Sequence, residues 1–220
     1  MKAIHPLLRW TLYGWLLSAL MAAIVLLFHR YFSWHGAALG ISAAYLARIV
    51  LGKGREANAF HKMAHLLVGG GASSTSRMAV GIGLFLLHLL LCLAALVSLP
   101  PLLASATLFS VIPFSRMAAC QLAQMLPYRG KSPLAPSPYS VADGLLLFTL
   151  GVLPACFLWW CATSLGYSLE WSWMLFASCV VLYGLYLLLA SRLRGYTYDG
   201  LVFVAAMLEI VFLLAMALTL

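Results

Sequence analysis

Residues 144–165 read GLLLFTLGVLPACFLWWCATSL and carry no charged side chain. A helix needs about 20 apolar residues to cross about 30 Å of hydrocarbon, so this stretch predicts a transmembrane helix. Hydrophobic residues make up 65% of the chain and charged residues 8%, which excludes an ordinary soluble domain. We therefore predict an all-α integral membrane protein with about seven transmembrane helices in one multispan domain, residues 1–220. The other six apolar runs are 7–28, 34–51, 78–99, 102–126, 171–191 and 201–220.

The basic residues predict how this domain is oriented. All but Arg30 and Arg116 of the 13 Lys and Arg residues lie near the N-terminus or in or beside alternate gaps between the runs. By the positive-inside rule, the N-terminus and the loops 52–77, 127–143 and 192–200 face the cytoplasm, which predicts the cytoplasmic (inner) membrane. A functional site should face the same side. The net charge of +8 then reflects topology and contact with membrane lipid, so nucleic acid is not an expected partner.

Two ionisable residues lie deep inside predicted spans. Arg116 is about ten residues from the cytoplasmic end of its run and Glu209 about nine, which at about 1.5 Å per residue is roughly 13 to 15 Å. An ionisable group at such depth usually faces a partner or a water-filled cavity. We expect these two side chains to be able to meet, either in a functional site or as an ion pair that fixes helix packing.

Short polar motifs follow one another in order along residues 75–220. The motifs are Ser76-Arg77, Ser115-Arg116, Tyr128, Lys131, Asp143-Gly144, Gly195-x-Thr197-x-Asp199, and Glu209 ten residues later. This set resembles the cobalamin synthase family, adenosylcobinamide-GDP ribazoletransferase. The resemblance implies a membrane-embedded transferase of late cobalamin biosynthesis that joins α-ribazole, or its phosphate, to adenosylcobinamide-GDP and releases GMP. Its substrates would be a corrinoid and a nucleotide.

The same resemblance implies a role for each of these residues. Phosphoryl-type transfer needs cations to neutralise the transferring group and a metal to hold its oxygens in line. Asp143 and Asp199 would hold Mg²⁺ together with substrate phosphates. Arg116, Asp199 and Glu209 would be catalytic. The residues expected to bind substrate or its phosphate are Ser76, Arg77, Ser115, Tyr128, Lys131 and Thr197.

The chain also departs from this family. Residues 44–56 contain no Asp where the family has an Asp-rich metal motif, and Thr75 and Ala206 replace two further family carboxylates. A second interpretation is therefore a non-catalytic relative that acts as a membrane scaffold or a corrinoid-binding partner subunit. A third is a small-solute transporter, because Arg116 and Glu209 are ionisable and lie within spans. A homo-oligomer or a complex with a partner subunit is compatible with each.

Histidines and cysteines give weaker signals. His61 and His65 are four residues apart on an expected short helix, where they form either a solvated face or a metal site that replaces the missing carboxylates. His88 lies in the third span and is expected to be a packed, hydrogen-bonded residue. The five cysteines all lie in predicted spans without a Cys-x-x-Cys pair, so we interpret them as small core residues.

Overall fold

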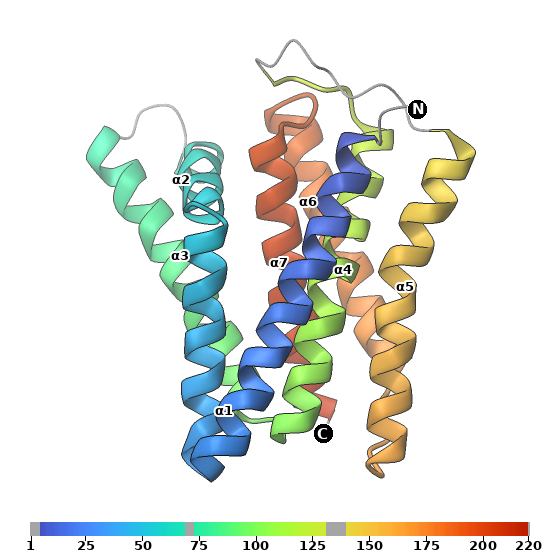
Figure 1. Cartoon of the computed structure of the whole chain (residues 1–220). Helices are drawn as coiled ribbons and strands as arrows, with labels where there is room; N and C mark the ends of the chain where they lie inside the picture. The colour runs from blue at the N-terminus through green and yellow to red at the C-terminus, as the bar shows by residue number, and fades with distance from the viewer. Residues whose placement is uncertain (1–4, 69–72, 131–139, 220) are drawn as a thin grey trace.

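The computed structural model describes residues 5–68, 73–130 and 140–219, and within them it is helical with no strand longer than an isolated bridge (Figure 1). Six helices are long and apolar enough to cross a membrane, and a seventh span is possible where two shorter helices join at a bend. This confirms the predicted all-α membrane protein. The helices are α1 Pro6–Leu51, α2 Arg55–Val68, α3 Ser74–Val97, α4 Pro101–Met125, α5 Val141–Ser164, α6 Trp171–Arg192 and α7 Tyr198–Thr219.

Helix α1 contains the first two predicted spans and folds back on itself. Its first arm is Pro6–Phe32 and its second arm is Gly36–Leu51, and Figure 1 shows the two arms running in opposite directions. The arms approach closely at Gly40, where an added Cβ would lie 3.0 Å from the Val25 Cα. The second arm spans only about 24 Å at 1.5 Å per residue, which is short for a membrane. It continues after a 76° bend into α2.

Helix α2 occupies much of the region predicted as the loop 52–77. The sequence there alternates charged and apolar side chains with helical spacing, and the helix buries one face, made of Ala59, Phe60, Met63 and Ala64. This face packs on α3 and α7. The short helix expected around His61 and His65 is confirmed, and the region is more ordered than a simple loop.

Helix α4 is the centre of the bundle. It packs against α1, α5 and α7, and 89% of its most apolar 18-residue window is buried. The helices around it are less buried, because much of their surface would face lipid. The buried hydroxyls of α4 are satisfied locally or by a neighbour; Ser110, for example, donates to the Pro154 carbonyl of α5 at 2.5 Å. A membrane helix fully enclosed by others can carry a polar residue such as Arg116.

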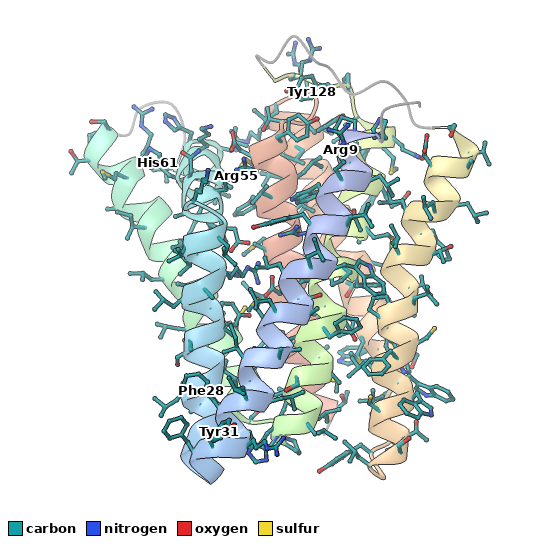
Figure 2. All side chains as sticks on the ribbon, in the orientation of Figure 1. Arg9, Phe28, Tyr31, Arg55, His61 and Tyr128 are labelled. Carbon is teal, nitrogen blue, oxygen red and sulfur yellow. The ribbon has the colours of Figure 1, made fainter. Side chains whose placement is uncertain are left out.

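The two ends of the bundle differ in charge. Arg9, Arg55, His61 and Tyr128 lie at the end where α1 begins, whereas Tyr31 lies at the opposite end (Figure 2). The connections after α4 and α6 meet at the first end, where the Arg129 N–H donates to the Tyr196 carbonyl at 2.8 Å. The gaps that are rich in basic residues therefore lie together at one end of the bundle.

Candidate functional site

The carboxylate of Glu209 pairs with Arg48, so the expected meeting with Arg116 is wrong. Arg48 Nη1 and Nη2 donate to the two Glu209 oxygens at 2.6 and 2.7 Å, and the Tyr45 hydroxyl donates to Oε1 at 2.9 Å. Arg48 also contacts Glu56 of α2 at 2.7 Å, so one guanidinium lies between two carboxylates. The reason is the fold of α1, whose second arm brings Arg48 towards α7 while Arg116 faces the first arm.

Arg116 instead lies against the aromatic side of the first arm of α1. Its side chain is 7% exposed, and its Nη1 donates to the Trp10 carbonyl at 2.9 Å. Its guanidinium carbon is 5.3 Å from the centre of the Trp10 ring and 5.4 Å from that of Tyr13, which are cation–π distances. Within the described residues, no carboxylate lies within ion-pair distance of Arg116. A buried cation without a countercharge is costly, which marks it as a functional candidate.

A pocket of about 190 Å³ opens beside these residues, and we call it the arginine pocket. Arg48 and Arg116 lie in its interior, and the exposed Lys53 and Arg55 lie at its rim. These four cations face the carboxylates of Glu56 and, behind Arg48, of Glu209, so two positive charges are in excess. The complete lining is Trp10, Tyr13, Leu17, Arg48, Leu51, Gly52, Lys53, Arg55, Glu56, Arg116 and Val202.

A glycine on α1 makes room for the buried arginine. A Cβ added at Gly14 would lie 2.8 Å from Arg116 Cδ and 3.3 Å from its Nε. Distances under 3.0 Å force one of the two groups to move, so a larger side chain here would displace the arginine. Gly14 therefore helps to set where the guanidinium points. The Trp10 carbonyl one turn earlier then holds one end of it.

The structure distributes the predicted binding residues over several places. Arg116 lines the arginine pocket, whereas Tyr128 lines a separate cavity of about 1020 Å³ between α4 and α5. The Tyr128 ring packs on those of Tyr196 and Tyr198 at 5.4 and 5.7 Å. Burial, with smaller contributions from the two neighbouring tyrosines, raises the pKa of Tyr196 to about 12. This cavity has no charged residue among its described lining residues.

Arg77 lies in a third pocket, of about 300 Å³, with His61 and His65. Arg77 Nη1 is 2.7 Å from Nδ1 of His65, which makes that nitrogen the acceptor of a hydrogen bond. The two imidazole rings are 6.5 Å apart between centres. An arginine in this position competes with a metal ion for His65, so the arrangement favours a hydrogen-bonded histidine.

The other residues expected to bind substrate make local contacts. The exposed Ser76 hydroxyl lies 2.9 Å from that of the α3 N-cap serine. The Ser115 hydroxyl is buried and donates to a carbonyl in the preceding turn of α4. Thr197 accepts a hydrogen bond from a backbone N–H in the first turn of α7. Lys131 lies outside the described residues.

The two expected metal ligands occupy the starts of different helices. Asp143 forms a capping box with Ser140 at the N-terminus of α5. Asp199, in the first turn of α7, forms an ion pair with Lys62 at 2.6 Å. Within the described residues, neither carboxylate belongs to a group of three possible metal ligands. These donors do not fit a Mg²⁺ site, because hard cations require several converging oxygen ligands.

The sequence prediction missed the partners that surround the two deep ionisable residues. Arg48 was counted only as a topological charge, although Tyr45 and Arg48 are spaced three residues apart and so share a helical face within an apolar run. Trp10 and Tyr13 share a face in the same way. Two polar or aromatic side chains on one helical face inside a span could have indicated the partners of the buried ionisable residues.

Comparison with known proteins adds no assignment. No family model, no curated protein and no solved structure matches the chain significantly. The similarity to cobalamin synthases therefore rests on the sequence motifs. A function has to be argued from the geometry and charge of the pockets.

Proposed function

We propose that this protein binds a phosphate-bearing ligand in the arginine pocket, with Arg116 as the main contact and without a divalent metal. One observation carries the proposal: Arg116 is buried and has no carboxylate partner among the described residues. A guanidinium presents several N–H donors in a plane, which matches the oxygens of a phosphate. The ligand would supply the countercharge that the bundle lacks.

The charge and size of the pocket support this ligand class. The excess of two positive charges around the pocket matches a phosphate monoester dianion. A volume of about 190 Å³ accepts one phosphate-sized group but is smaller than pockets that enclose whole ligands, which are about 300–1,000 Å³. The rest of the ligand would extend past the rim, where Lys53 and Arg55 add further attraction. Trp10 and Tyr13 provide an apolar wall for a ligand that is partly in the membrane.

The ion pairs of Arg48 are the reason that we propose a ligand site without a divalent metal. Its guanidinium pairs with Glu56, the one carboxylate among the described lining residues of the pocket, so the pocket lacks the converging oxygens that a Mg²⁺ site requires. Asp199 is likewise paired with Lys62. The proposal thus corresponds to a relative of the cobalamin synthases that binds a corrinoid phosphate or nucleotide as a partner subunit.

The family's transfer reaction is the second candidate. The observation that favours it is the cavity of about 1020 Å³ lined by Tyr128, which is large enough for a whole ligand. In that case adenosylcobinamide-GDP and α-ribazole would yield GMP and a cobalamin product. A small-solute transporter has less support, because the deep Glu209 is already paired with Arg48.

Calorimetric binding to the protein in nanodiscs tests the first candidate. The probes are adenosylcobinamide phosphate, GDP and pyrophosphate as free ligands, and nanodiscs with and without phosphatidic acid as the lipid source. We expect one of these to bind, and Arg116→Gln to weaken it about 10- to 100-fold, since a hydrogen bond to a charged group contributes about 1.5–3 kcal/mol. The control is Arg192→Gln, an exposed arginine in the last turn of α6.

Three results would decide between the candidates. Equal binding by Arg116→Gln and wild type would refute the role of the arginine pocket. Formation of GMP and cobalamin product from the two substrates, dependent on added Mg²⁺, would instead support the transferase. Binding without turnover, lost in Arg116→Gln and kept in Arg192→Gln, supports the metal-independent binding protein.

A further inference from the structure

A second group of polar side chains lies inside the bundle, where Glu209 links it to Arg48 at the arginine pocket. His88 and Cys92 are one turn apart on α3 and face Glu209 of α7. All three are buried, with exposures of 0%, 0% and 1%. One possible ligand atom from each lies within 4.8 Å of the other two, and the His88 Nδ1 is 3.8 Å from the Cys92 sulfur. Three metal-binding side chain types thus converge from two helices.

The histidine of this group has an unmet polar atom. His88 Nε2 is buried and has no hydrogen-bond partner, while the ring packs against Phe60 and Phe85. Buried polar atoms in proteins are nearly always paired, so each exception needs an explanation. Packing among aromatic rings accounts for the ring, and Cys92 contacts Nδ1, but neither accounts for Nε2. A ligand between His88 and Cys92 would use one of those nitrogens.

The carboxylate of Glu209 retains capacity for another contact. A carboxylate has about four lone-pair directions. Oε1 accepts from Tyr45 and from Arg48 Nη1, whereas Oε2 accepts only the Arg48 Nη2 hydrogen bond among the described contacts. Ligating carboxylates in metal sites are commonly held by such outer hydrogen bonds. The contacts to Arg48 and Tyr45 thus orient Glu209 without using all of its acceptor positions.

We infer that His88, Cys92 and Glu209 form a binding site for a zinc-class divalent cation that joins α3 to α7. Imidazole, thiolate and carboxylate are the ligands that Zn²⁺ takes, at about 2.0–2.3 Å, whereas Mg²⁺ prefers oxygen alone. Ligands at those lengths around a tetrahedral ion are separated by roughly 3.3–3.8 Å, so pairs that now lie further apart, up to 4.8 Å, need to close by up to about 1.5 Å.

Charge is consistent with such an ion. Zn²⁺ binds the thiolate, so the Cys92 thiol releases one proton for each ion bound. The ion and the thiolate together add one positive charge. The neighbouring group of Arg48, Glu56 and Glu209 carries one negative charge, so the two compensate each other. The site does not need the ligand of the arginine pocket, although Arg48 lines that pocket and also orients Glu209, and its role is to hold α3 and α7 together.

Metal binding by the purified protein in detergent tests this inference. We expect about one Zn²⁺ per chain after desalting, measured by elemental analysis. We also expect Co²⁺ to give a thiolate-to-cobalt charge-transfer band in the near ultraviolet. Cys92→Ala and His88→Ala should each weaken Zn²⁺ binding by at least about 100-fold, because loss of an outer-sphere partner already costs about 10- to 100-fold.

The controls separate this site from the other histidines and thiols. His65→Ala removes the surface histidine pair, and Cys156→Ser removes an exposed thiol of α5; neither should change the charge-transfer band. The band is read on the wild-type protein, so the test does not depend on how well the Cys92 variant folds. Absence of a thiolate band, or a band that survives Cys92→Ala, would overturn the inference.

Discussion

Replacement of Glu209 by Gln tests the central ion pair most directly. The change keeps the shape of the side chain and removes one negative charge. Arg48 then loses two charge-assisted hydrogen bonds, now at 2.6 and 2.7 Å, in a site that is 1–4% exposed. Breaking a buried pair by removing one partner costs about 3–5 kcal/mol. Glu56 still compensates Arg48, so we expect a loss near the lower limit, about 3 kcal/mol in the free energy of unfolding.

Equilibrium unfolding by denaturant in mixed micelles measures this loss. The matched control is Asp199→Asn, whose ion pair with Lys62 has the same 2.6 Å length but side chains that are 33% and 53% exposed. An exposed pair contributes about 0–1 kcal/mol, so this variant should change little. The triple variant Arg48→Met, Glu56→Gln and Glu209→Leu should recover most of the stability, since apolar or neutral residues can replace a buried group of charges. Equal, small losses for Glu209→Gln and Asp199→Asn would refute the reasoning.

Three further predictions follow from other parts of the molecule. Ser140→Ala removes the N-cap of α5 and should cost about 1 kcal/mol in the same unfolding assay, and no loss would contradict the capping box. Tyr196 should titrate near pH 12 by ultraviolet absorbance, a phase absent in Tyr196→Phe. Because its pKa is raised from 10.0 to about 12 on folding, its contribution to stability is complete below pH 10 and is lost between pH 10 and 12. On a cysteine-free background, a membrane-impermeant maleimide added to the cytoplasmic side should label Arg55→Cys but not Tyr31→Cys, and the reverse pattern would invert the proposed orientation.

The spans were predictable because each depends on local composition. The length of an apolar run and the basic residues at its ends decide where a helix crosses and which ends lie together. The second predicted run, 34–51, was less regular: it forms a 16-residue arm that joins α2 at a bend of 76°. Hydropathy measures how apolar a segment is and not the direction of its axis. It therefore does not predict the bend at the turn Gly52 to Gly54, which joins two helical segments.

The partners of the buried charges were not predictable in the same way. Counting residues from the end of each apolar run gives Arg116 and Glu209 a similar depth in the membrane. The count contains no information on which helices are neighbours in the bundle. The fold of α1 decides this, since its two arms present Arg48 and Trp10 to different neighbours. A long arginine side chain also reaches a carboxylate well below its own Cα, so backbone depth is a poor guide to pairing.

The Arg48–Glu209 pair has a consequence for how the protein is made. The two residues are 161 positions apart, and Glu209 lies in α7, which leaves the ribosome after the six other described helices. At about 5–20 residues per second, roughly 8 to 32 s pass between their synthesis. During that time Arg48 has only Glu56 as a countercharge, so the nascent bundle stays incomplete until α7 arrives. A chain truncated before Glu209 would leave Arg48 with Glu56 as its one carboxylate partner and without its most buried one, which gives membrane quality control a feature by which to recognise unfinished copies.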